Sequence, residues 1–140
     1  MNILCTICVR GGSKGVKNKN IKKINNKPLV SYTVEQAIKS KIFKCITVSS
    51  DSDKILNVVK KNGVKDLIKR PKKLAKDVSP KIPAIRHCLI EMEKKHNKTF
   101  DIIIDLDATS PLRKISDIKK ALRKMILDNN NNLFTVCPSR

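Results

Sequence analysis

The segment from Arg10 to Asn20 has the composition of a phosphate-binding loop. It reads Arg10-Gly11-Gly12-Ser13-Lys14-Gly15 and closes with Lys19-Asn20. Closely spaced glycines let the backbone approach a ligand, and successive backbone N–H groups in such a turn can bind phosphate oxygens. The Arg and Lys side chains add charge-assisted hydrogen bonds to an anion. We therefore predict that this loop binds the phosphates of a nucleotide.

The spacing of the glycines excludes two common phosphate-binding loops. A Walker A loop needs a second glycine followed by Lys-Ser or Lys-Thr, and a dinucleotide fingerprint needs the pattern G-x-G-x-x-G. The glycines here stand at positions 11, 12 and 15, which fits neither pattern. A loop of another type is therefore expected, and the competing interpretation is an ordinary strand-to-helix turn with solvated lysines.

A second chemically informative pattern is Asp105-Leu106-Asp107. Two residues apart on an extended strand, the two carboxylates point to the same face. A nucleotide-sugar glycosyltransferase could hold a divalent metal ion with such a pair. Alternatively, Asp105 caps a helix or pairs with a lysine. The basic glycine loop fits a nucleotidyltransferase better than a glycosyltransferase.

The cysteines and histidines have no spacing typical of a disulfide framework or a metal site. The five cysteines are Cys5, Cys8, Cys45, Cys88 and Cys137, an odd number. On a strand, Cys5 and Cys8 would face opposite sides of the sheet. We predict core thiols in a reducing compartment, and no metal ligands among the candidate site residues. His87 and His96 are expected to have surface or capping roles.

Short apolar stretches alternate with segments of helical periodicity along the chain. An Ile- and Val-rich run without helical spacing indicates a buried strand. The expected strands span residues 3–9, 45–49, 64–68, 101–106 and 133–136, and the expected helices span residues 28–40, 52–62, 82–95 and 116–127, the last capped by Ser116. Strands joined by helices of this length form parallel sheets that are covered on both faces. We predict one α/β domain with three layers.

The polar segments that could do chemistry all follow expected strands. They comprise residues 10–20, 49–51, 70–79 and 107–113. Ligands of a parallel α/β sheet bind beyond the carboxyl ends of the strands. These segments should therefore meet at one edge of the sheet, and we predict an active site there.

The net charge of +19 invites a nucleic-acid interpretation. However, the basic residues are mostly Lys and are scattered along the whole sequence rather than clustered. We expect no specific nucleic-acid partner, although the charge should favour non-specific binding to polyanions at low salt. No stretch approaches the roughly 20 apolar residues of a membrane span, and no signal peptide precedes Arg10, so we expect no membrane association and a cytoplasmic location.

Six motifs follow one another along the chain. They are the loop 10–15 with Lys19-Asn20, Pro28-Leu29 with Tyr32-Thr33, Val48-Ser49-Ser50-Asp51, Arg70-Pro71 with Leu74-Ala75 and Asp77, Thr109-Ser110-Pro111-Leu112-Arg113, and Asp117-Ile118. This pattern resembles the acylneuraminate cytidylyltransferases, also called CMP-sialic acid synthetases, over nearly the whole chain. The stretch from Asp105 to Arg113 is similar to that of bacterial members proposed to activate legionaminic acid or related nonulosonic acids.

The resemblance implies a fold and a reaction. The fold would be the three-layer α/β/α nucleotide-diphospho-sugar transferase fold, which is Rossmann-like with a mostly parallel sheet. The reaction would join CTP and a nine-carbon sugar acid to give a CMP-sugar and pyrophosphate, with the anomeric hydroxyl attacking the α-phosphorus in line. Catalysis of this kind depends mostly on positioning and on stabilisation of charge.

The resemblance also assigns roles to individual residues. Arg10, Lys14 and Lys19 would be catalytic, because they would hold the triphosphate and stabilise the leaving pyrophosphate. The CTP site would further include Gly11, Gly12, Ser13, Asn20, Arg70, Asp77 and Ser79. Asp107, Thr109 and Ser110 would face the sugar. Arg113 could contact a ligand or simply clamp a helix end.

Two departures from the family pattern qualify this assignment. Many members that activate sialic acid carry Gln where this chain has Asp107, and a carboxylate there repels the carboxylate of the sugar. Asp107 should instead accept hydrogen bonds from amides or hydroxyls, or meet a metal. The family also continues beyond position 140 with a dimerisation element and the aspartate pair that binds Mg²⁺. Residues 1–140 are thus expected to be the N-terminal portion of a Mg²⁺-dependent, homodimeric enzyme; the alternative is an inactive truncated remnant.

Overall fold

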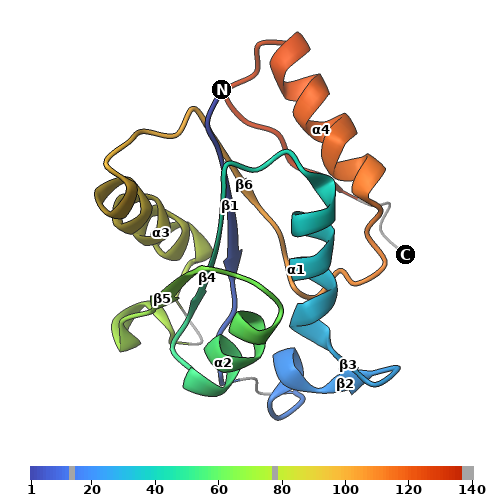
Figure 1. The fold of residues 1–140 in the computed structure, drawn as a ribbon, viewed down its shortest axis with the longest axis vertical. Coiled ribbons are helices and arrows are strands. Elements are labelled where there is room, and N and C mark those ends of the chain that lie inside the picture. Colours follow the sequence, from blue (N-terminus) through green and yellow to red (C-terminus); the bar gives the residue numbers. More distant parts are fainter. Residues whose placement is uncertain (13–14, 77–78, 137–140) are drawn as a thin grey trace.

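The structure, a computed structural model that describes residues 1–12, 15–76 and 79–136, is built around a four-stranded sheet. The strands are β1 (Ile3–Cys8), β4 (Cys45–Ser50), β5 (Asp66–Lys69) and β6 (Ile102–Asp105), in the spatial order β5-β4-β1-β6. Every neighbouring pair in this sheet is parallel, with Thr6 of β1 opposite both Thr47 and Asp105. The predicted parallel sheet is confirmed, and β1 lies at its centre (Figure 1).

Helices cover both faces of the sheet. α1 (Leu29–Ser40), α2 (Asp53–Lys61) and α4 (Ile115–Leu127) lie on one face, and α3 (Lys81–His96) lies on the other (Figure 1). Alternate side chains of β1 divide the core accordingly, because successive strand residues point to opposite faces. Ile7 packs with α1 and α2, whereas Leu4 packs with Cys88 and Met92 of α3. The predicted three-layer α/β architecture is confirmed.

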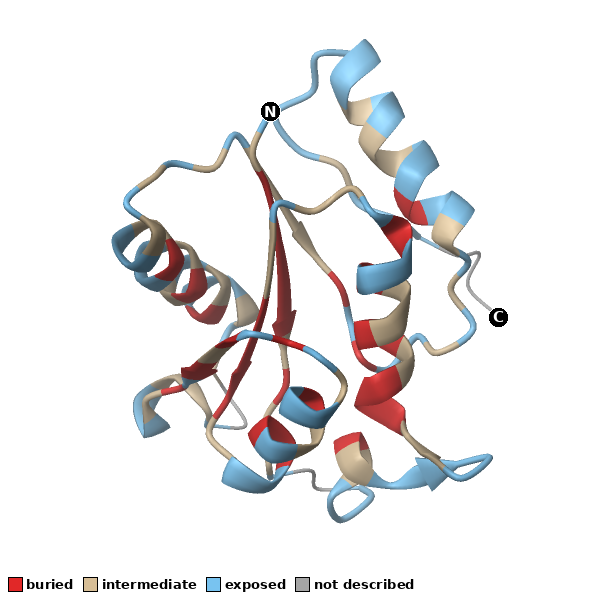
Figure 2. Cartoon of the chain, viewed as in Figure 1, coloured by how far each residue is buried: buried red, intermediate tan, exposed pale blue. Residues whose placement is uncertain are grey.

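The hydrophobic core follows the two central strands and the inner sides of α1, α2 and α3 (Figure 2). The described cysteines belong to this core or border it. Cys5 and Cys88 are buried, Cys8 and Cys45 are half-buried, and all four are free thiols. Cys5 and Cys8 pack in different core clusters on opposite faces of the sheet, as predicted. Cys137 lies outside the described residues.

Two local predictions are wrong. Residues 133–136 form no strand, and Phe134 and Val136 are 77% and 91% exposed. A short apolar run becomes a strand only where a neighbouring strand accepts its hydrogen bonds, and these residues pair with no strand of the described sheet. Ser116 does not cap α4, which begins one residue earlier. The carboxylate of Asp117 instead accepts a hydrogen bond from the backbone N–H of Lys114, 3.1 Å long.

The chain between the glycine loop and α1 contains a small hairpin that the sequence did not predict. A 3-10 turn, η1 (Lys19–Ile21), precedes β2 (Lys23–Ile24) and β3 (Lys27–Pro28), which pair antiparallel. Asn25 and Asn26 form the turn between them, both with positive φ, a conformation that Asn tolerates better than most residues. Strands of two residues are too short to produce a periodic pattern. The hairpin leads directly into α1.

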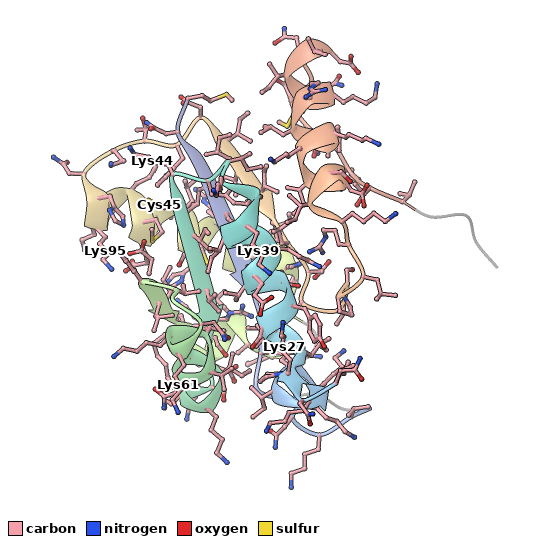
Figure 3. The ribbon with its side chains drawn as sticks, turned by 45° about the vertical axis from the view of Figure 1, so that its right-hand side comes forward. Lys27, Lys39, Lys44, Cys45, Lys61 and Lys95 are labelled. Carbon is pink, nitrogen blue, oxygen red and sulfur yellow. The ribbon has the colours of Figure 1, made fainter. Side chains whose placement is uncertain are left out.

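The positive charge is spread over the molecule. The lysines labelled in Figure 3 come from several elements, including Lys27 of β3, Lys39 of α1, Lys61 of α2 and Lys95 of α3. This spread matches the scatter of lysines along the sequence. Within the described ranges, no helix is both long enough and apolar enough to cross a membrane.

Candidate active site

A cavity of about 530 Å³ lies beyond the carboxyl ends of the strands. Parts of three of the four predicted polar segments line it: 10–20 after β1, 70–79 after β5, and, of the segment 107–113 after β6, residues 107–109. Its polar and charged lining residues are Arg10, Lys19, Asn20, Arg70, Lys76, Ser79, Lys81, Asp107 and Thr109. Segments that are distant in sequence therefore meet at one edge of the sheet, as the strand topology predicted.

The fourth predicted segment, residues 49–51 at the end of β4, contacts the glycine loop. The backbone N–H of Gly11 donates a hydrogen bond to Oδ1 of Asp51, 2.8 Å long. A Cβ atom at position 11 would lie 2.9 Å from Cβ of Ser52, so only glycine fits there without displacing its neighbours. Asp51 therefore fixes the start of the loop rather than lining the cavity.

The other end of the loop is held by Asn20. This residue is 6% exposed, and its Nδ2 donates a hydrogen bond to the backbone carbonyl of Arg10, 3.0 Å long. That bond closes the loop and places Arg10 and Lys19 on the same cavity. Gly12 is exposed at the surface of the loop. Ser13 and Lys14, to which the resemblance gives phosphate-binding roles, lie outside the described residues.

Arg70 forms a fixed part of the cavity wall. It is 7% exposed, and its Nε and Nη2 donate hydrogen bonds to Oγ and the backbone carbonyl of Ser49, 3.1 and 2.9 Å long. These bonds orient a buried guanidinium toward the end of β4. Ser79 also lines the cavity, with its hydroxyl 3.2 Å from the carbonyl of Lys73. Asp77 lies outside the described residues.

Lys81, which sequence reasoning missed, also lines the cavity. It is the first residue of α3, and its ammonium forms ion pairs with both Asp105 and Asp107, the latter at 2.5 Å. Thr6 of β1 donates a hydrogen bond to the other oxygen of Asp105, 2.9 Å long. Burial by itself would lower the pKa of Lys81, but the two carboxylates outweigh it and raise that pKa above its usual value. Lys81 is therefore protonated at neutral pH.

The loop after β6 is clamped onto α1. Thr33 and Arg113 both donate hydrogen bonds to the backbone carbonyl of Asp107, 3.1 and 2.9 Å long. Gln36 of α1 donates to the carbonyl of Pro111 at 2.8 Å and accepts from Nη1 of Arg113 at 3.1 Å. Burial lowers the pKa of Arg113. Arg113 therefore holds the loop that carries Asp107 against the middle of α1, rather than clamping a helix end.

Two of the three residues predicted to face the sugar line the cavity. These are Asp107 and Thr109, whereas Ser110 is exposed and is not among the lining residues. The sequence did not identify Lys81 as a site residue. It is one of many lysines, and a lysine at the start of a helix is usually exposed to solvent. Its partner Asp107 is 26 positions away, a pairing that only the fold creates.

Among the residues that the structure describes, Asp105 and Asp107 do not form an open magnesium site. Mg²⁺ requires oxygen ligands in near-octahedral geometry, usually including free carboxylates. The ammonium of Lys81 is paired with both of these carboxylates. A metal ion would have to displace that lysine.

A second group of potential ligands lies at the amino ends of β4 and β5. The ligand atoms of Cys45, Asp66 and His96 lie within 4.8 Å of one another. A thiol and an imidazole suit zinc better than Mg²⁺, so this group does not supply the predicted cofactor site. Asp66 Oδ1 also pairs with Nζ of Lys95 at 2.8 Å, and Figure 3 shows Lys95 near Cys45. His96 lies 3.1 Å from the same carboxylate oxygen, a partner that the sequence did not reveal.

Comparison with known proteins identifies the family. Residues 4–137 match the cytidylyltransferase family. The chain is 48% identical over 138 residues to the "Post-translational flagellin modification protein B" of Campylobacter coli, covering 99% of this chain and 59% of that protein. It is 50% identical over 109 residues to the "CMP-N,N'-diacetyllegionaminic acid synthase" of Campylobacter jejuni, covering 78% of this chain and 46% of that protein. The chain thus spans about half the length of these curated relatives.

Solved structures agree on the fold. A CMP:2-keto-3-deoxy-manno-octonic acid synthetase, solved in complex with CTP, matches with a TM-score of 0.72 at 22% identity, covering 92% of this chain and 49% of that chain. A cytidylyltransferase from Leptospira borgpetersenii matches with a TM-score of 0.69 at 20% identity, covering 91% and 50% of the two chains. The family match over residues 4–137 shows that the chain belongs to the cytidylyltransferase family, and its relatives include proteins named as a CMP-N,N'-diacetyllegionaminic acid synthase and as pseudaminic acid cytidylyltransferases.

Proposed function

We propose that this chain is the CTP-binding portion of an enzyme that activates a nonulosonic acid. The reaction transfers CMP from CTP to a nine-carbon sugar acid and releases pyrophosphate. The observation that supports it best is that residues from two loops line the same cavity. Arg10 and Lys19 come from the glycine loop, and Asp107 and Thr109 come from the loop after β6. Cations suit a nucleotide triphosphate, and polar side chains suit a hydroxylated sugar acid.

Arg10 and Lys19 of the glycine loop would bind and activate the triphosphate. Arg10 leaves the end of β1 and Lys19 begins η1, and the bond from Asn20 to the carbonyl of Arg10 holds both ends of the loop together. Arg10 and Lys19 would stabilise the charge that develops on the leaving pyrophosphate. Lys14, to which the family resemblance gives the same role, would do so as well. Preorganised cations of this kind accelerate a displacement because they need no reorganisation as the charge shifts.

The remaining walls would position the nucleoside and the sugar. Arg70 and Ser79 lie on the side of the cavity formed by the loop after β5, to which the family resemblance assigns cytidine. Asp107 and Thr109 lie on the loop clamped by Arg113, where the sugar would sit. Holding the anomeric hydroxyl in line with the α-phosphorus is the main contribution required, since positioning dominates such reactions.

The main rival is a glycosyltransferase that binds a metal ion with Asp105 and Asp107. The ammonium of Lys81 is paired with both carboxylates, which disfavours a metal ion at that position. We therefore favour the cytidylyltransferase. A Mg²⁺ ion, a homodimeric assembly, a cytoplasmic location and the absence of a nucleic-acid or membrane partner remain parts of the proposal. The ligands of Mg²⁺ would come mainly from outside these 140 residues, which would form the N-terminal portion of the catalytic domain.

The experiment is a release assay for pyrophosphate with the natural polypeptide that carries this chain. CTP is combined in turn with legionaminic, pseudaminic and N-acetylneuraminic acid, and the CMP-sugar product is identified by mass spectrometry. We expect turnover with CTP and at least one of these acids, and little with UTP. Release of pyrophosphate that does not depend on any sugar acid, or an equal rate with UTP, would contradict the proposal.

A further inference from the structure

We propose that Cys8 and Cys88 form an oxidisable thiol pair beside the cavity, which a peroxide joins into a disulfide that weakens the binding of CTP. The effect on CTP rests on the proposed function, whereas formation of the disulfide does not. The two sulfur atoms lie 3.8 Å apart, although the residues are 80 positions apart in the sequence. Cys8 ends β1 and lines the cavity, and Cys88 is fully buried in α3. An accessible thiol and a buried thiol are therefore in contact.

The fold directs the two thiols toward each other. Alternate residues of a strand point to the same face of a sheet, so Cys8 shares with Leu4 the face that α3 covers. Cys88 lies in the middle of α3 and packs in the same hydrophobic cluster as Leu4 and Met92. The S–S bond of a disulfide is about 2.0 Å long, so the two sulfur atoms must approach each other by roughly 2 Å. A strand and a helix that already pack together hold them ready for this step.

Ser49 and Arg70 connect the thiol pair to the cavity wall. Nε of Arg70 donates a hydrogen bond to Oγ of Ser49 at 3.1 Å, and the Ser49 hydroxyl is hydrogen-bonded to Cys88. The hydrogen bond with Cys8 lowers the pKa of Cys88, and Ser49 and the charge of Arg70 lower it further against the effect of burial. Cys8 keeps its proton because the Cys88 sulfur accepts it, which raises the pKa of Cys8. The pair thus loses its first proton more readily than an isolated buried thiol, and a thiolate is the form that reacts with oxidants.

Hydrogen peroxide supplies the oxidant, and Cys8 is the thiol that it can reach from the cavity. After the proton of Cys8 passes to Cys88, the Cys8 sulfur attacks a peroxide oxygen and the O–O bond breaks. A sulfenic acid forms, and the leaving hydroxide takes the proton from Cys88 and becomes water. The Cys88 thiolate then attacks the Cys8 sulfur, so that the S–S bond forms as the S–O bond breaks and a second hydroxide leaves. Two electrons thus pass from the two thiols to the peroxide.

The disulfide would alter the surroundings of Arg70 in the cavity wall. Arg70 and Cys8 both line the cavity, as does Ala84, which precedes Cys88 by about one turn of α3. Oxidation removes the negative charge that Arg70 and Ser49 stabilise on Cys88, and it draws Cys8 toward α3. The oxidised protein should therefore bind CTP less tightly than the reduced protein. By linkage, bound CTP should shift the equilibrium between thiols and disulfide toward the thiols.

The test uses the natural polypeptide and its variants Cys8→Ala and Cys88→Ala. Cys45→Ala is a matched control, because Cys45 is a free, half-buried thiol at the opposite end of β4 from Ser49. Thermal unfolding first establishes that each reduced variant is folded, and the half-buried Cys8→Ala carries the comparison if Cys88→Ala does not fold. Each protein is then treated with hydrogen peroxide. Tryptic digestion without reductant and mass spectrometry identify the linked peptides, with fragmentation to separate Cys8 from Cys5.

Titration calorimetry measures CTP affinity before oxidation, after oxidation and after treatment with dithiothreitol. We expect a disulfide between Cys8 and Cys88 in the wild type and in Cys45→Ala. CTP affinity of both should fall about two- to tenfold on oxidation, roughly the effect of one hydrogen bond, and recover with dithiothreitol. The affinity of Cys8→Ala and Cys88→Ala, each compared with its own reduced form, should show no such reversible loss.

Two results would overturn the proposal. Thiols that peroxide leaves unlinked, or oxidises separately, would show that Cys8 and Cys88 are not a reactive pair. A complete disulfide with unchanged CTP affinity would show that the pair does not act on the cavity. Failure of the proposed function would appear differently, as no CTP binding by the reduced wild type, and the mass spectra would then still decide whether the thiol pair exists.

Discussion

Asp51 and Gly11 join two loops that come from different strands of the sheet. The carboxylate of Asp51, after β4, accepts the backbone N–H of Gly11, after β1, at 2.8 Å. The adjacent Ser52 closes against the same glycine, at 2.9 Å from where a Cβ would stand. The glycine loop is therefore held in place by a neighbouring loop, and its geometry depends on the absence of a side chain at position 11.

A first prediction compares two neighbouring glycines. Gly11→Ala forces Ser52 or the loop to move, and overpacking of this kind typically costs about 1–3 kcal/mol. Gly12→Ala meets nothing within 4 Å and serves as the control. We expect Gly11→Ala to lower both the melting temperature and the affinity for CTP, and Gly12→Ala to leave the melting temperature unchanged. Equal effects of the two changes would show that contact with Ser52 does not shape the loop.

The clearest prediction about catalysis concerns the side chain of Arg10. Arg10→Ala in the natural polypeptide should reduce turnover by about two to three orders of magnitude, because a preorganised cation that stabilises the leaving pyrophosphate is lost. The melting temperature should change little. Lys17→Ala, on an exposed position of the same loop, should keep wild-type turnover. Rates come from steady-state pyrophosphate release. A wild-type rate for Arg10→Ala would remove Arg10 from the site, and unfolding would indicate a structural role instead.

Asp107 should influence which sugar is used. Asp107→Gln introduces the side chain that many sialic-acid-activating relatives carry, according to the family resemblance. One polar contact typically shifts substrate preference by about 1–3 kcal/mol, so the ratio of kcat/KM values should move roughly tenfold to a hundredfold towards N-acetylneuraminic acid. Competition between two sugar acids measures this ratio. If Asp107 binds a metal ion instead, activity on all sugars should fall together and excess Mg²⁺ should partly restore it.

We expect the bonds that Arg113 makes to the loop after β6 to affect binding of the sugar acid but not binding of CTP. Arg113→Ala removes the hydrogen bonds to the carbonyl of Asp107 and to Gln36. Loss of such part-buried bonds should destabilise the fold by about 1–3 kcal/mol and raise KM for the sugar acid. CTP affinity should be nearly unchanged. Arg123→Ala, exposed on α4, is the control. Denaturant unfolding and calorimetry measure the two effects, and a loss of CTP affinity equal to the loss for the sugar would refute this division of the cavity.

The sequence predicted the elements with strong local signals. The apolar runs that became β1 and β4 were found because buried parallel strands are apolar on both faces. The position of the site followed from topology, since strands of one parallel sheet end at one edge. Residues whose role depends on distant partners were not predictable. Lys81 is distinguished from other lysines only by Asp105 and Asp107, which the fold brings to it. The strand predicted at 133–136 was wrong because an apolar run does not show whether a neighbouring strand is present to pair with it.

The most direct test of the central claim is a calorimetric titration of this chain with CTP, UTP, ATP and GTP at two salt concentrations. The account predicts saturable binding of CTP at one site, weaker binding of the other three nucleotides, and a clear loss of CTP affinity in Arg10→Ala. The preference for CTP should persist at the higher salt concentration, because a nucleoside site is less sensitive to screening than net charge. Binding that is equal for all four nucleotides and disappears as salt rises would contradict it, and would indicate non-specific attraction of polyanions to a chain of net charge +19.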